Sequence, residues 1–245
     1  MSDHNEFMKR NKAVIDSMGI DKDLEEKTKD WFLAANNKEY SYHFSWMGRP
    51  IIQYPQDVVA MQEIMWDVKP DLIIETGIAR GGSLVMYASF MEMMGIENGH
   101  VLGIDIDIRE HNRIEIESHP MARRISMLQG SSTDKNIVDQ VKEYAKNYNT
   151  ILVILDSNHT HEHVAKELEL YSGLVSVGSY CVVFDTVVED MPENSFPNRP
   201  WDKGDNPKTA VWEFISKNDN FIINKDIQNK ILITVAPDGY LKRVK

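Results

Sequence analysis

From Asp71 onward, short apolar runs alternate with longer segments of helical periodicity, and this alternation limits the possible folds more than any other feature. Runs that are apolar throughout are typical of strands buried on both faces of a parallel sheet. The predicted strands cover 72–75, 101–105, 125–129, 151–155 and 180–184, and the predicted helices cover 56–68, 83–94, 137–148 and 163–174. The pattern favours an α/β fold, with a doubly wound, Rossmann-like sheet and helices on both of its faces.

The end of the chain departs from this alternation. Two apolar runs, 221–224 and 231–235, are too close in sequence for a crossover helix between them. Strands joined by a short connection pair in the antiparallel sense. We therefore expect a mostly parallel sheet whose last strand is antiparallel.

A length of 245 residues suffices for one α/β core, and no segment marks a second domain of comparable size. We expect an N-terminal arm with helices over 1–55, which contacts substrate or another subunit, ahead of a main domain over 56–245. Within the arm, Gly48, Pro50 and Pro55 favour extended backbone. The aromatic and apolar residues before Asp71 suit a subunit interface, so we expect a homo-oligomer.

Charge, cysteine content and the distribution of apolar residues limit the partners and the location that we expect. The net charge of −11 argues against a nucleic-acid partner, because that affinity depends on clustered Lys and Arg. The single cysteine, Cys181, lies in an apolar run, which predicts a core position. No apolar stretch approaches the length of a membrane span, and the first residues lack a signal pattern, so we expect a cytoplasmic protein without a membrane partner.

The first strand leads into a glycine turn of the form E-x-G-x-x-x-G-G-S, from Glu75 to Ser83. The helix after such a turn has free N–H groups that can contact a small molecule. A carboxylate at Glu75 repels a pyrophosphate but suits a ribose hydroxyl or a cationic amino group. The pattern indicates a nucleoside with a charged amino-acid tail, although glycines alone also fit a simple tight turn.

Two further strand ends fit the same ligand. Asp105 ends the strand 101–105 and is placed to bind ribose hydroxyls. Ser131 lies in a polar stretch after the strand 125–129 and suits an adenine edge. A helix cap at Ser132 or Thr133 explains that stretch equally well.

A second group of candidates follows the strands 151–155 and 180–184. Asp156 and Asp185 converge if these strands are neighbours, and hard oxygen ligands favour Mg²⁺, Mn²⁺ or Ca²⁺. His159 is close enough to Asp156 to act as a general base on a substrate hydroxyl. Glu189 and Asp190 are reserve metal ligands, although adjacent acids before a proline are also commonly just solvated.

Other interpretations of these residues stay open. His159 and His161 with one carboxylate would make a two-histidine iron site, typical of a 2-oxoglutarate hydroxylase, although that chemistry usually occurs in a β-barrel. Alternatively, the chain is a non-catalytic nucleoside-binding or assembly protein. His163 is expected to begin the next helix.

The segment from Met191 to Lys208 is rich in Pro, Asn and Asp and contains Phe196 and Trp201. A connection this long in a compact domain is usually functional or disordered. Its aromatic residues favour a lid or substrate-contacting segment over a solvated insertion.

Together, these motifs make the chain similar to the cephalosporin hydroxylase and rhamnosyl O-methyltransferase family, a family of class I S-adenosylmethionine-dependent methyltransferases. The resemblance runs from about Trp46 to the end and rests on four stretches: 75–83, 103–107, 156–159 and 182–185. It implies a seven-stranded sheet and methyl transfer to a hydroxyl of a sugar or natural product, often with a divalent metal such as Mg²⁺. It also implies that Asp156 binds the metal and that His159 is the base. Relatives carry a Glu-Asp pair where this chain has Phe184-Asp185, so one expected ligand is missing.

These expectations assign each residue a role toward S-adenosylmethionine. Gly77 permits its close approach, Glu75 lies near its amino-acid part, and Asp105 holds the ribose. Arg80 and Ser83 bind the methionine carboxylate, with Ser83 assisted by the helix N-terminus. The acceptor is expected to be a small molecule that presents a sugar hydroxyl.

Overall fold

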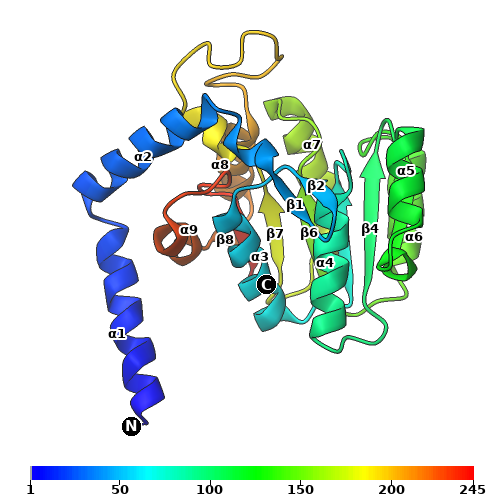
Figure 1. Cartoon of the computed structure of the whole chain (residues 1–245), viewed down its shortest axis with the longest axis horizontal. Coiled ribbons are helices and arrows are strands. Elements are labelled where there is room, and N and C mark those ends of the chain that lie inside the picture. The colour runs from blue at the N-terminus through cyan, green and yellow to red at the C-terminus, as the bar shows by residue number, and fades with distance from the viewer. Residues whose placement is uncertain (1) are drawn as a thin grey trace.

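Seven strands form the main sheet of the computed structural model, which describes residues 2–245 (Figure 1). Their order is β5 (Ile125–Gln129), β4 (His100–Asp105), β3 (Leu72–Thr76), β6 (Ile151–Leu155), β7 (Tyr180–Val183), β9 (Tyr240–Arg243) and β8 (Phe221–Ile223). Strand β9 is antiparallel to both of its neighbours, and the pairs from β5 to β7 are parallel. The predicted Rossmann-like, mostly parallel sheet is confirmed.

Helices cover both faces of the sheet and divide the core into two layers. One layer contains residues of α3 (Pro55–Val68), α4 (Gly82–Met93), α5 (Glu110–Glu117) and α9 (Lys225–Ile231), and the other contains residues of α6 (Lys135–Ala145), α7 (His161–Tyr171) and α8 (Pro207–Lys217). Successive strand residues face opposite layers, so Ile73 packs in the first and Ile74 in the second. Cys181 is buried in the second layer, as predicted.

Short 3₁₀ helices lie in the connections between the longer elements: η1 (Tyr40–His43), η2 (Ala122–Arg124), η3 (Ser172–Leu174) and η4 (Thr186–Asp190). Proline and capping residues place the longer helices. Pro55 stands in the first turn of α3, and Asn206 with Thr209 forms a capping box at the start of α8.

The prediction of a strand over 231–235 is wrong. Ile231 ends helix α9, and Leu232 has a left-handed φ of 60° that interrupts regular structure. Thr234 and Val235 instead donate hydrogen bonds to the buried carboxylate of Asp57 at the start of α3. An apolar run of this length does not distinguish a strand from buried irregular backbone. The antiparallel strand is β9. In the sequence, helix α9 lies between β8 and β9, which pair directly in the sheet.

The N-terminal segment contains two helices and a hairpin. Helices α1 (Asp3–Met18) and α2 (Lys22–Asn36) lie on the side of the molecule where α9 packs, and α1 contacts α9 (Figure 1). Strands β1 (Phe44–Trp46) and β2 (Arg49–Ile51) form a small hairpin, which packs against α4 through a 2.9 Å hydrogen bond from Trp46 Nε1 to Ser89 Oγ. The extended backbone expected around Gly48 and Pro50 is present as the strands of this hairpin. Among residues 2–245, no helix combines the length and apolarity needed to cross a membrane.

Candidate active site

The turn after β3 is held in place by the acid at the end of β4. Asp105 Oδ2 accepts hydrogen bonds from the backbone N–H groups of Ile78, at 2.8 Å, and Ala79, at 3.2 Å. Gly77 has a φ of 91°, and a Cβ there would collide with the carbonyl oxygen of Asp156. The turn therefore requires glycine at this position, both for its φ and for its close approach to the end of β6.

Two residues that sequence reasoning missed fix the other side of this turn. The Arg49 guanidinium donates to the carbonyl oxygen of Arg80 at 2.6 and 3.1 Å. Asn112 donates to the carbonyl oxygen of Ala79 at 3.0 Å and accepts from Arg49 at 3.2 Å. No local pattern predicts these contacts, because they join the hairpin and α5 to a turn that is distant in the sequence.

Glu75 lies beneath the turn and is only 1% exposed. Ser83 Oγ donates a 2.7 Å hydrogen bond to its carboxyl group. Burial raises the pKa of Glu75 to about 8, so the free side chain is mostly neutral at pH 7. A cationic group placed beside it would favour its ionised form.

Two further predicted ligand contacts are Arg80 and Ser131. The Arg80 side chain is exposed, and Ser131 Oγ lies 3.0 Å from Thr133 Oγ1. Like Glu75 and Ser83, neither residue lines the cavity described next, so donor binding by these four residues stays a prediction. The alternative cap at Ser132 or Thr133 is wrong, because Asp134 caps α6 by accepting from the N–H groups of its first turn.

One cavity of about 370 Å³ joins the glycine turn to the second group of predicted residues. From the turn side it is lined by Gly77, Ala79 and Asp105, and from the adjacent strand ends by Asp156, His159 and Asp185. The remaining walls come from the N-terminal segment and from the loop 191–206, with Phe32, Tyr42, Gln53, Tyr54, Phe196, Arg199 and Trp201 among them. Sequence reasoning did not identify the N-terminal residues.

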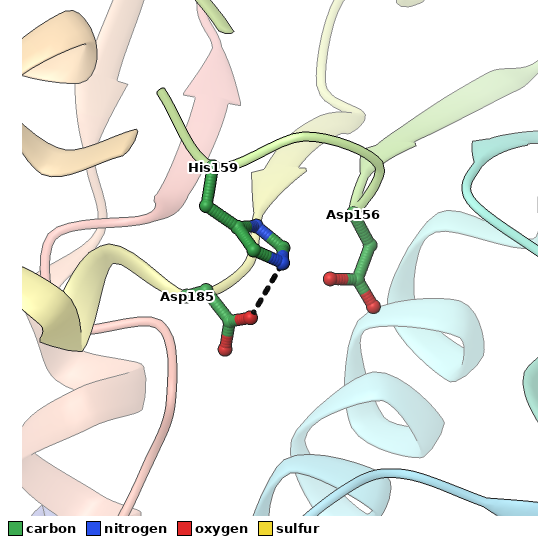
Figure 2. Close-up of side chains that lie close together, drawn as sticks. All are labelled: Asp156, His159 and Asp185. Carbon is green, nitrogen blue, oxygen red and sulfur yellow. Dashed lines mark ion pairs between the residues drawn. The ribbon is translucent and has the colours of Figure 1, made fainter. Parts of the chain in front are cut away.

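Asp156, His159 and Asp185 lie together at the ends of the neighbouring strands β6 and β7 (Figure 2). Each offers one ligand atom, and these atoms lie within 4.8 Å of one another. His159 Nε2 is 3.1 Å from Asp185 Oδ2, the contact dashed in Figure 2. Asp185 has a left-handed φ of 55°, which turns the chain sharply at the end of β7.

The electrostatics of this cluster favour a cation. Burial, followed by the nearby carboxylates of Asp185 and Glu75, raises the pKa of Asp156 well above its usual range. A divalent cation would relieve that repulsion and favour the ionised carboxylates. The two carboxylates are hard oxygen donors that fit Mg²⁺ or Mn²⁺, and the imidazole of His159 lies beside them.

Phe184, Glu189 and Asp190, which lie near Asp185 in the sequence, supply no further metal ligand. The Phe184 side chain is 1% exposed and belongs to the core. Glu189 accepts from Gly204 N and Asn206 Nδ2 at 2.8 and 2.6 Å, and Asp190 pairs with Lys208 at 2.6 Å. The structure therefore contradicts Glu189 and Asp190 as reserve ligands, since both anchor the ends of the loop 191–206.

The two-histidine iron site is also contradicted. His161 begins α7 and faces α8, with Thr209 Oγ1 at 2.8 Å and Glu213 Oε2 at 2.9 Å. His163 contacts Ser132 and Ser157 at 3.1 and 3.2 Å. Within residues 2–245, His159 is the one histidine that clusters with the two acids.

The loop 191–206 covers His159. The Trp201 ring packs edge-on against the His159 ring, with 4.7 Å between centroids. The Arg199 guanidinium lies 5.2 Å from the Trp201 ring centroid. The loop predicted as a lid or substrate-contacting segment thus lines the cavity with the aromatic side chains of Phe196 and Trp201 and with the cationic side chain of Arg199.

The sheet order and the glycine turn define a Rossmann-like α/β protein with its ligand site at the carboxyl ends of the strands. Residues 38–244 match the family described as rhamnosyl O-methyltransferase/CmcI. Relatives named rhamnosyl O-methyltransferase from Mycobacterium tuberculosis and Mycobacterium bovis are 32% identical over 204 residues, covering 81% of this chain and 78% of theirs. The chain belongs to this family of S-adenosylmethionine-dependent O-methyltransferases, which confirms the predicted family and enzyme class.

Solved structures share the fold at lower sequence identity. CmcI, in a structure described as containing Mg and SAM, has a TM-score of 0.59 and 19% identity, covering 83% of this chain and 78% of CmcI. An O-methyltransferase from Bacillus cereus in complex with SAH has a TM-score of 0.53 and 15% identity, covering 89% and 91% of the two chains. These similarities support the predicted fold.

Proposed function

We propose that this protein transfers the methyl group of S-adenosylmethionine to a hydroxyl of a sugar on a small-molecule or natural-product acceptor. The observation that carries the proposal is the single cavity that contains both the glycine turn with Asp105 and the cluster of Asp156, His159 and Asp185. The relatives named rhamnosyl O-methyltransferase support a sugar as the acceptor.

The methyl donor lies across the ends of β3 and β4 in this proposal. Glu75, next to the turn, binds the cationic amino group, and Ser83 with Arg80 contacts the carboxylate. Asp105 holds the ribose hydroxyls, since a carboxylate that accepts two turn N–H groups keeps further lone pairs. Ser131 serves the adenine edge.

Asp156 and Asp185 would hold a divalent cation, with Mg²⁺ supported by the CmcI structure that contains Mg and SAM. The chemistry that such an ion would supply is to orient the acceptor hydroxyl and lower its pKa. His159 then removes the hydroxyl proton, with its imidazole oriented by Asp185 at 3.1 Å and by the Trp201 ring.

Atoms and charge balance in the transfer. The acceptor oxygen attacks the methyl carbon in line with the carbon–sulfur bond, which breaks and leaves a neutral thioether. The proton moves to the imidazole of His159. Because the leaving group is good, the protein contributes mainly position and deprotonation.

The N-terminal segment 1–55 has two roles in the proposal. Phe32 and Tyr42 line the acceptor side of the cavity, opposite the main domain that begins near residue 56. Helix α1 buries none of its residues and exposes Phe7, Met8 and Val14. An exposed apolar helix face of this kind suits contact with another subunit of a homo-oligomer.

Mass spectrometry tests the reaction directly. The protein is incubated with S-adenosylmethionine, Mg²⁺ and a panel of rhamnosyl and other glycosides, and products are examined for one added methylene mass. We expect methylation that EDTA abolishes and added Mg²⁺ restores. Transfer to none of the glycosides would overturn the acceptor class, whereas transfer unaffected by EDTA would overturn the metal.

A further inference from the structure

Two polar atoms in the wall of the catalytic cavity have no hydrogen-bond partner among the described residues. They are Oε1 of Gln53 and the hydroxyl oxygen of Tyr54. The two side chains are 4% and 1% exposed, so solvent does not compensate them well. A buried polar group without a partner costs stability, and native proteins contain few of them.

Their location separates this pair from the other unpartnered atoms. Unpartnered buried atoms also occur in Gln56, Tyr87, Glu167, Ser179 and Asp238, none of which lines this cavity. Gln53 and Tyr54 are adjacent in sequence, between β2 and α3, and they share the cavity with Asp156, His159 and Asp185. Two unmet hydrogen-bonding groups therefore border the place where the acceptor hydroxyl must react.

The aromatic packing around Tyr54 fixes the direction of its hydroxyl. Its ring stacks on Phe32, with 5.0 Å between centroids and an interplanar angle of 17°. Trp31 and Tyr40 also pack against it, at 6.3 and 5.4 Å. A ring enclosed by three aromatic neighbours cannot turn its hydroxyl toward solvent at low cost, so the group is preorganised for a partner inside the cavity.

The chemistry of the pair matches a polyhydroxylated ring. An amide oxygen accepts a hydrogen bond, and a phenol both donates and accepts. Sugar hydroxyls offer the same capacity on adjacent carbons. When one hydroxyl reacts at the cluster of acids, its ring neighbours are the groups that reach a second polar patch on the same cavity wall.

We propose that Gln53 and Tyr54 form a subsite that binds sugar hydroxyls adjacent to the one that is methylated. The inference rests on the proposed function, because it assumes a sugar acceptor in this cavity. The subsite selects for a ring with a neighbouring free hydroxyl and fixes which hydroxyl faces His159. An acceptor without that hydroxyl leaves the buried groups unpaired, and sites of this kind reject such analogues strongly.

The test compares wild type with Tyr54→Phe and Gln53→Leu. The acceptors are the best glycoside of the panel and its analogues lacking one hydroxyl each. Wild type is expected to prefer the complete sugar over one deoxy analogue by roughly 10- to 100-fold in kcat/KM. Each variant is expected to lose most of that preference, because its methylation of the complete sugar falls toward the rate for the analogue.

Two controls exclude a merely structural effect. Removing an unpartnered hydroxyl by Tyr54→Phe is expected to leave the melting temperature at or above that of wild type, and affinity for S-adenosylhomocysteine unchanged. The matched variant Tyr148→Phe, outside the cavity lining, is expected to keep the wild-type preference.

The outcomes distinguish the two proposals. Retained preference for the complete sugar in both variants overturns the subsite and leaves the sugar methyltransferase proposal standing. Wild type that methylates no glycoside overturns the proposed function and the subsite with it. A preference lost in the variants at unchanged stability and donor affinity supports both.

Discussion

The proposed donor and acceptor regions of the cavity are built in different ways. The donor region comes from the turn 77–81 and from Asp105, whose contacts are largely to backbone atoms. The acceptor region combines side chains from α2, the β2–α3 connection, the ends of β6 and β7, and the loop 191–206. The hydrogen bonds that fix the turn involve backbone N–H groups and so depend little on the side chains of the turn, whereas the other region depends on each of its dispersed side chains.

The largest expected effect separates turnover from donor binding. His159→Ala is expected to lower kcat by about 10²- to 10⁴-fold, which is the range for a general base. Affinity for S-adenosylhomocysteine is expected to stay the same, because the change lies on the acceptor side. His161→Ala is the matched control, since His161 faces α8. Near-normal turnover of His159→Ala would remove His159 from the role of base.

A smaller effect is expected from a substitution on the donor side, and it should lower both the stability of the protein and its affinity for the donor product. Gly77→Ala combines a left-handed φ with a collision against the Asp156 carbonyl. Strain alone costs about 1–3 kcal/mol, and the collision adds to it. Gly178→Ala is the control, because Gly178 has a φ of 88° and open space around it. Denaturant unfolding and titration with S-adenosylhomocysteine should show a larger loss for Gly77→Ala in both, and equal losses would contradict the close approach.

The smallest expected effect is the number of protons released when the donor product binds. Glu75 has a pKa of about 8 in the free protein, so it is mostly protonated at pH 7. A bound ammonium group lowers that pKa, and donor-product binding therefore releases up to one proton. Calorimetry in two buffers of different ionisation enthalpy measures the release, which Glu75→Gln should remove. Equal release by wild type and variant would place the amino group elsewhere.

The difference between the regions also explains what the sequence predicts. Strand β3, Glu75 and Gly77 follow one another along the chain, so an apolar run, an acid and a glycine predict them together. Asp156 and Asp185 are predicted as a pair because neighbouring parallel strands end at one edge. Local pattern and sheet topology suffice for these positions.

The remaining features depend on packing between distant segments. Arg49 and Asn112 support the turn through contacts across 31 and 33 residues, and no local pattern marks them. The run 231–235 has the composition of a strand but is held by the buried acid Asp57. Gln53 and Tyr54 are identified as candidate binding residues only because they line the cavity, so sequence patterns do not predict this role.

Titration calorimetry with S-adenosylhomocysteine tests whether the cavity contains a donor site that is independent of the acceptor cluster. The titration uses wild type and Asp156→Asn, each with and without EDTA. We expect one bound molecule per chain in all four experiments, with similar affinity, while Asp156→Asn loses methyl transfer. Absence of binding to the wild-type protein would rule out this donor site.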